Sequence, residues 1–168
     1  VADLSQLQGR ADAVSAVLDR CGGKLDGLVL CAGLGVVVKP HTKSAAVNYF
    51  GAVAMLDGLR VALERGSAPA AVVVSSVSSV QMTWETNPIG RALEAGDEEQ
   101  VAAALAGAGD YAGHVAYAGS KNALTVALYQ AMADALRAAV DDGTVRDVLI
   151  TGQPGVFTSG NDIEGFMS

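Results

Sequence analysis

Three short apolar runs alternate with helical patterns along the chain, and this alternation constrains the fold more than any other feature. The runs are Leu28–Cys31, Ala71–Val74 and Val148–Ile150. Each is continuous and apolar, which is typical of strands that are buried on both faces of a parallel sheet. The order strand, helix, strand, helix, strand predicts an α/β fold: a doubly wound, Rossmann-like parallel sheet with helices on both faces.

The segments around these runs have helical spacing of their apolar residues. We expect Ser5 to cap the first helix and Gly22 to end it, since these residue types favour those positions. The acidic, Ala-rich stretch Leu93–Leu105 could form one or two short helices. The three longer helices are expected at Leu4–Cys21, Val47–Arg65 and Tyr117–Val140.

Composition excludes several classes of protein. With 168 residues, 51% hydrophobic and 17% charged, the chain can bury a core and is not a disordered segment. A net charge of -7 without a basic run disfavours nucleic-acid binding. No apolar run approaches the roughly 20 residues that span a bilayer. We interpret Cys21 and Cys31 as small buried residues of a cytoplasmic protein, and residues 1–168 as a single partial domain, incomplete at both ends.

Tyr117 and Lys121 stand four residues apart, so on a helix their side chains share a face. A free tyrosine titrates near pH 10, and a nearby cation favours the phenolate. Such a pair can form a tuned proton donor or acceptor. The plain alternative is a surface lysine beside a half-buried tyrosine. Tyr111 has no lysine at this spacing, because Val115 stands four residues after it.

Two further polar residues stand where a ligand could reach them. Ser76 follows the second apolar run, and ligands of parallel sheets bind beyond the carboxyl ends of the strands. Asn48 lies inside a helical pattern, where asparagine is unfavourable unless its side chain has a partner. Its alternative reading is an ordinary exposed helix position.

These residues together resemble the short-chain dehydrogenase/reductase family over about residues 1–128. Several stretches are similar to its 3α-hydroxysteroid dehydrogenase/carbonyl reductase branch, which also has a long segment between serine and tyrosine; here Tyr117 follows Ser76 by 41 positions. The motifs that match the family are Asp3-Leu4, Cys31-Ala32-Gly33, Val47-Asn48, Ser75-Ser76 and Tyr117 to Lys121. The stretches that are similar to the branch are Leu28 to Gly35, Asn48 to Ala52 and Ala116 to Ala127.

The resemblance implies hydride transfer between NAD or NADP and a secondary alcohol or ketone, a class that includes steroid-like substrates. The implied catalytic residues are Tyr117 as acid-base, Lys121 as its tuning cation, Ser76 as carbonyl ligand and Asn48 as holder of a relay water. It also implies a homo-oligomer, a dimer or tetramer that pairs through the helices of Asn48 and Tyr117, with neither membrane nor nucleic acid as partner. The implied cofactor-binding residues are Asp3, Leu4, Cys31, Ala32, Gly33, Tyr117, Lys121, Pro154 and Gly155.

Two features depart from this family. No Gly-rich, pyrophosphate-binding turn precedes Asp3. Residues from about 121 to 168 resemble the N-terminal part of an enoyl-CoA hydratase/isomerase (crotonase) protein, in which the backbone N–H of Asn161 would donate to a thioester oxyanion. We therefore expect a splice near residues 121–128. Alternatively, Val145–Thr158 supplies a dehydrogenase strand and its Pro154-Gly155 turn beside the nicotinamide, or the end of the chain is a plain polar tail.

The chain thus supports three functional hypotheses. The first is an NAD(P)-dependent dehydrogenase, the second is a crotonase-type acyl-CoA enzyme fragment, and the third is a folded fragment without catalysis. No metal site is expected, because neither His41 nor His114 has a partner ligand at zinc spacing. The acidic cluster Glu94–Glu99 reads as a solvated helix face.

Overall fold

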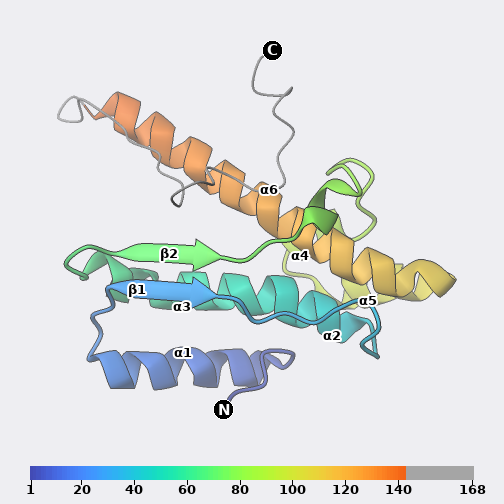
Figure 1. The fold of residues 1–168 in the computed structure, drawn as a ribbon, viewed down its shortest axis with the longest axis horizontal. Helices are drawn as coiled ribbons and strands as arrows, with labels where there is room; N and C mark the ends of the chain where they lie inside the picture. The colour runs from blue at the N-terminus through green and yellow to red at the C-terminus, as the bar shows by residue number, and fades with distance from the viewer. Residues whose placement is uncertain (143–168) are drawn as a thin grey trace.

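A computed structural model describes residues 1–142 as two parallel strands packed beside helices (Figure 1). Residues 143–168, with the predicted strand Val148–Ile150, lie outside the described residues. The elements in chain order are α1 (Leu7–Cys21), β1 (Gly27–Leu30), α2 (Thr42–Ala45), the π-helix η1 (Ala46–Gly51), α3 (Ala52–Glu64), β2 (Ala70–Val73), the 3₁₀ helix η2 (Val77–Val80), α4 (Gly90–Glu94), α5 (Glu98–Gly107), the 3₁₀ helix η3 (Gly109–Tyr111) and α6 (Ala112–Asp141).

The sheet confirms the α/β prediction in its coarse form. β1 pairs with β2 in parallel, in a register that places Leu30 opposite Val73. In the described residues the strands are not buried on both faces as expected. Leu30 is half-buried, whereas Val29 is 66% exposed and Val72 is 44% exposed. Figure 1 shows α1 and α3 stacked together beside the strands, and α1 packs on α3.

The first helix starts later than the sequence predicts. α1 begins at Leu7 after Gln6, which makes no side-chain capping bond. The prediction that Ser5 caps this helix is wrong, because the N-cap position falls on Gln6. The Ser5 Oγ accepts from the Gln6 side chain at 3.4 Å, and the Ser5 backbone N–H donates to the Asp3 carboxylate at 2.9 Å. The predicted stop is confirmed: Gly22 adopts a left-handed φ of 59°, and its N–H bonds the Leu18 carbonyl.

The second helical stretch begins at Thr42, five residues before the predicted start, and continues through α2, η1 and α3 to Glu64. By length and composition alone it is apolar enough to cross a membrane, but half of its most apolar window is buried inside the structure. Leu59, within α3, is completely buried. A core helix of a folded domain has these same properties.

The stretch Leu93–Leu105, predicted to form one or two short helices, falls in two, α4 and α5. Asp97 caps α5 by accepting a hydrogen bond from the Gln100 N–H at 2.8 Å. α4 and α5 both pack against α6, and α5 also contacts α2. Residues 74–111, between β2 and α6, are called the inserted segment below. This segment therefore covers one side of the helices that carry Asn48 and Tyr117. The buried residues that share this core include Tyr49, Ile89, Leu93, Val101, Leu105, Ala116 and Leu124.

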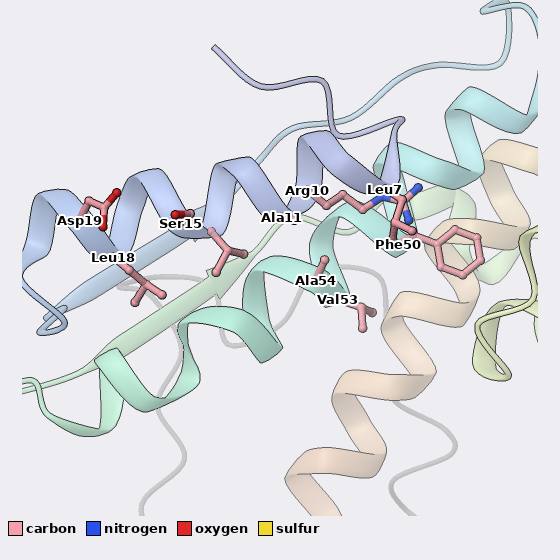
Figure 2. A pocket seen from close by; sticks show the side chains of 10 residues that line it. Leu7, Arg10, Ala11, Ser15, Leu18, Asp19, Phe50, Val53 and Ala54 are labelled. Carbon is pink, nitrogen blue, oxygen red and sulfur yellow. The ribbon is translucent and has the colours of Figure 1, made fainter.

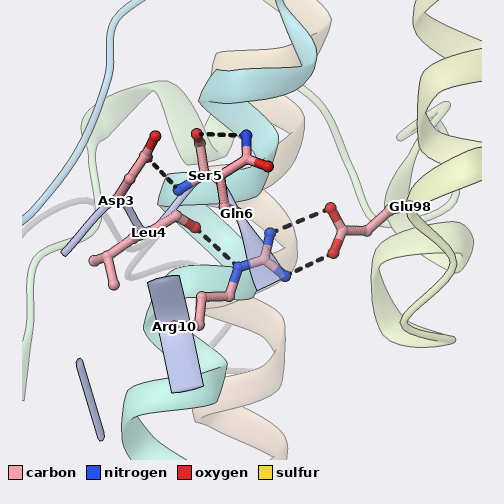
Figure 3. A network of polar contacts seen from close by, with 6 residues as sticks. All are labelled: Asp3, Leu4, Ser5, Gln6, Arg10 and Glu98. Atoms are coloured by element: carbon pink, nitrogen blue, oxygen red, sulfur yellow. Dashed lines mark hydrogen bonds and ion pairs between the residues drawn. The ribbon is translucent and has the colours of Figure 1, made fainter. Parts of the chain in front are cut away.

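Arg10 ties the N-terminal segment to the inserted helices (Figure 3). Its side chain is only 5% exposed and lies over the ring of Phe50. The guanidinium donates to the Leu4 carbonyl at 2.9 Å and to both carboxylate oxygens of Glu98 at 2.6 and 3.2 Å. Residues 94–99 are exposed, which agrees with the prediction of a solvated helix face. The bidentate pair between Glu98 and Arg10 is an additional contact that the sequence did not predict.

Removing one partner of this pair tests its contribution to the fold. Glu98→Gln leaves the buried Arg10 cation without its counter-charge, so we expect a loss of about 1–3 kcal/mol in the free energy of unfolding. The matched control is Glu94→Gln, which breaks an exposed pair with Arg91 and should cost less than about 1 kcal/mol. Urea denaturation measures both, and equal losses would contradict a special role for the buried pair.

Candidate active site

The ends of the two strands bring the predicted catalytic residues together. Because β1 and β2 run in parallel, Cys31–Gly33 and Val74–Ser76 leave the sheet at the same edge. α6 passes this edge and presents Tyr117 to it. The Tyr117 hydroxyl donates to the Ser76 Oγ at 3.2 Å. Both side chains are half-buried, so a ligand can still reach the pair.

Ser76 is fixed by its own backbone as well as by Tyr117. It precedes η2, and its Oγ accepts a hydrogen bond from the Ser78 N–H at 3.1 Å. Its carbonyl accepts from the Ser79 N–H at 3.0 Å. The serine therefore caps a short turn while facing the tyrosine.

Lys121 lies one helical turn after Tyr117, on the same face of α6. It is 5% exposed, and its Nζ donates to the Val74 carbonyl at 2.7 Å. Burial lowers the pKa of the Lys121 amine below its usual value, since a charged group loses hydration when it is buried. A cation held at this place fits the tuning role that the resemblance implies.

Asn48 lies in η1, the π-helical part of the long helix, and such segments recur at functional sites. Its side chain is 1% exposed. Its Oδ1 accepts from the Leu34 N–H at 2.8 Å, and its Nδ2 donates to the Leu34 carbonyl at 3.0 Å and to the Ser120 Oγ at 3.4 Å. The Asn48 side chain thus holds the loop after β1 against α6; its predicted water relay stays a prediction.

Gly33 lies between these groups. A Cβ at this position would stand 3.3 Å from the Asn48 Oδ1 and 3.9 Å from the Lys121 Nζ. The absence of a side chain keeps that space open at the strand edge, which suits a cofactor that approaches the backbone closely.

Four of the predicted cofactor residues line one cavity of about 570 Å³, namely Asp3, Leu4, Ala32 and Gly33. Hydrogen bonds from Ser5 hold the pKa of the Asp3 carboxyl below its usual value, so this exposed carboxylate remains an acceptor at neutral pH. Cys31 lines a neighbouring cavity of about 310 Å³. It is exposed and Cys21 is only half-buried, so the expected burial of the cysteines is wrong.

Pro154, Gly155 and Asn161 lie outside the described residues, so their predicted roles stay predictions. Within residues 1–142, no cluster of His, Cys, Asp and Glu side chains could hold a metal ion. A further cavity, of about 610 Å³, lies between α1 and α3 (Figure 2). Its lining includes Leu18 and Phe50, and no predicted catalytic residue, so it is not the candidate site.

Sequence reasoning missed the polar contacts that surround the site. Ser75 meets Thr125 at 2.6 Å between their hydroxyl oxygens, and Asn87 pairs with Asn122 at 3.1 Å. Asn122 directly follows Lys121 inside a helical pattern. The same argument that singled out Asn48 applies to it, since mid-helix asparagine needs a partner.

Comparison with known proteins supports the dehydrogenase part of the sequence analysis. The chain is 50% identical over 128 residues to the 3-alpha-hydroxysteroid dehydrogenase/carbonyl reductase of Comamonas testosteroni, a match that covers 76% of this chain and 50% of the relative. The resemblance to this branch is confirmed. The crystal structure of the 3-alpha-hydroxysteroid dehydrogenase from Pseudomonas sp. B-0831 complexed with NADH is similar at a TM-score of 0.74 and 48% identity, over 82% of this chain and 54% of that chain.

The chain spans about half the length of these relatives. The second resemblance is also confirmed, since the enoyl-CoA hydratase/isomerase family model matches residues 118–168. That match includes most of α6, which runs without a break from Ala112 to Asp141.

The buried Lys121 gives the stability of the fold a pH dependence. Because its pKa is lowered in the folded protein, the unfolded chain binds the proton more tightly. Stability should therefore rise with pH, from the lowered pKa of the folded protein up to the usual lysine pKa of 10.5. Lys121→Met removes the titration, so the difference in unfolding free energy between wild type and variant should move in favour of wild type between pH 7 and about pH 10. Urea denaturation at both pH values measures it; a constant difference would contradict the burial of a charged amine.

Proposed function

We propose that this chain carries the catalytic residues of an NAD(H)-dependent oxidoreductase that acts on a secondary alcohol or ketone of steroid-like type. The observation that carries the proposal is the Tyr117–Ser76 hydrogen bond at the carboxyl edge of a parallel sheet, beside the buried Lys121. The names of the two relatives support the reaction class and the substrate class.

The hydroxyls of Ser76 and Tyr117 would have different roles toward the carbonyl oxygen of the substrate. In the structure the Tyr117 O–H donates to Ser76, which leaves the serine hydrogen free for another acceptor. A ketone oxygen placed between them would accept a hydrogen bond from Ser76 and the proton from Tyr117. Lys121 would stabilise the phenolate left behind. A bound nicotinamide supplies the hydride to the carbonyl carbon, and alcohol oxidation reverses both transfers.

The cavity beside the strand edge suits a dinucleotide. Its volume of about 570 Å³ lies within the usual range for small-molecule sites. The ionised Asp3 would accept from an amino group such as that of adenine, and Gly33 would admit the cofactor toward Lys121. The complex of the Pseudomonas relative with NADH favours NAD over NADP. The predicted contacts of Pro154 and Gly155 would complete this site.

The finer features of the whole protein are also proposals. We propose a doubly wound Rossmann-like sheet, a cytoplasmic location and a homo-oligomer. Because α4 and α5 cover one side of the helices of Asn48 and Tyr117, pairing on that side would include the inserted helices rather than bare helix faces.

A second candidate is a crotonase-type activity on an acyl-CoA. The match of residues 118–168 to the enoyl-CoA hydratase/isomerase family favours it. The decisive comparison adds NADH and a steroid ketone to one sample and an enoyl-CoA to another. We expect NADH absorbance to fall in the first and no hydration in the second. Hydration alone would favour the crotonase fragment, and silence in both, with a folded circular-dichroism spectrum, would favour a non-catalytic fragment.

Replacing the proposed acid-base tests the assignment of Tyr117. Tyr117→Phe keeps the ring and removes the ionisable oxygen, so turnover with NADH and ketone should fall by at least about 10². Tyr111→Phe is the matched control, because Tyr111 is 75% exposed on η3, and its turnover should match wild type. Near-normal turnover of Tyr117→Phe would contradict the assignment.

A further inference from the structure

We infer that Asn122 and Asn87 are positioning residues that hold the Ser76 turn against α6 and so keep Ser76 within reach of Tyr117. This inference rests on the proposed dehydrogenase function and adds residues that act through Ser76 rather than on the substrate.

Asn122 binds the turn from the helix side. Its side chain is 7% exposed, and its Nδ2 donates to the carbonyls of Ser79 and Met82, both at 3.0 Å. These carbonyls lie at η2 and just after it, three and six residues beyond Ser76. Both hydrogens of the amide are therefore used on the backbone of the segment that Ser76 begins.

Asn87 completes the arrangement from the far end of the same loop. It is 7% exposed, and its Nδ2 donates to the Gly119 carbonyl at 2.9 Å and to the Asn122 Oδ1 at 3.1 Å. Its Oδ1 accepts from the Ile89 N–H at 3.2 Å. The polar atoms of both amides thus have partners, as buried polar groups require.

The backbone of α6 is adapted to this contact at Gly119. A Cβ there would stand 2.8 Å from the Asn87 Oδ1 and 2.9 Å from the Ile89 Cγ1. A side chain would therefore push the loop away from the helix, two residues after Tyr117. The glycine between Tyr117 and Lys121 permits the close approach.

The length of the insertion explains why such a tie is needed. Ser76 and Tyr117 are 41 residues apart, and α4 and α5 lie between them. If the loop between the Ser76 turn and α4 were not bonded to α6, a movement of α4 and α5 would displace the Ser76 turn. Asn122 bonds the Met82 carbonyl, and Asn87 accepts from the Ile89 N–H. These two bonds hold the loop that joins the Ser76 turn to α4.

A displacement of a reacting group by about 1 Å can cost 10²-fold in rate. Asn122→Asp keeps the size and the Oδ1 acceptor but turns a carboxylate oxygen toward the carbonyls of Ser79 and Met82. We expect kcat for ketone reduction to fall by about 10- to 100-fold, with the KM for NADH unchanged, because the cofactor cavity does not include this amide. Gln130→Glu makes the same amide-to-carboxylate change at an exposed position of α6 and should match wild type.

Hydrogen exchange gives a readout that does not need turnover. In Asn122→Asp the amides of Ser78 and Ser79, which bond to Ser76, should exchange faster, while that of Val74, bonded to Leu30, should not. If Asn122→Asp fails to fold, Asn87→Asp provides the second variant, since it keeps the bond from Ile89 and loses only the donors to α6. The same kinetic and exchange results are expected of it.

These experiments distinguish a failure of the positioning role of Asn122 and Asn87 from a failure of the proposed dehydrogenase function. Wild-type kcat in a folded variant of either residue overturns the inference and leaves the proposed function intact. A parallel loss of kcat and of NADH affinity also overturns it, since that marks general damage to the fold. Absence of ketone reduction in the wild-type chain overturns the proposed function, and with it the positioning role, whatever the exchange rates show.

Discussion

The geometry of the candidate site depends on hydrogen bonds between α6 and the segment that leaves β2. Lys121 bonds the Val74 carbonyl, Thr125 meets Ser75, and Tyr117 meets Ser76. Asn122 then fixes the carbonyls of Ser79 and Met82. One helix therefore holds five successive points of one loop, and most of these groups are wholly or partly buried, where an unpaired polar group would cost about 1–3 kcal/mol. The position of the serine follows from this helix rather than from the strand alone.

The same helix lies where two kinds of sequence meet. Its first part belongs to the region that resembles the hydroxysteroid dehydrogenases, and the enoyl-CoA hydratase/isomerase match begins at residue 118, before Lys121. α6 nevertheless continues unbroken to Asp141, because both sequences supply Ala-rich, helix-favouring residues at these positions. The contacts of α6 that organise the candidate site fall at or before Thr125. Those of Lys121, Asn122 and Thr125 therefore lie within the stretch that both resemblances include.

Much of this could be predicted from residue patterns. Short apolar runs predicted both strands, and the Tyr117–Lys121 spacing predicted a shared helix face. The start of α1 could not be predicted, because the turn before it, in which the Ser5 N–H bonds to the Asp3 carboxylate, depends on local polar contacts that apolar periodicity does not report. The exposure of Val29 and Val72 depends on which helices pack against the sheet. The sequence of one strand does not contain that information. The Arg10–Glu98 and Asn87–Asn122 pairs join residues 88 and 35 positions apart, so only the folded chain reveals them.

In the proposed reaction, hydride passes from a nicotinamide to a ketone that is bound at the Tyr117–Ser76 pair. The most direct measurement is mass spectrometry of the alcohol formed from a steroid ketone in the presence of NADH deuterated at the transferred position of the nicotinamide. The account predicts one deuterium on the carbinol carbon of each product molecule. Alcohol without deuterium, or no alcohol from a folded chain at saturating NADH, would contradict it.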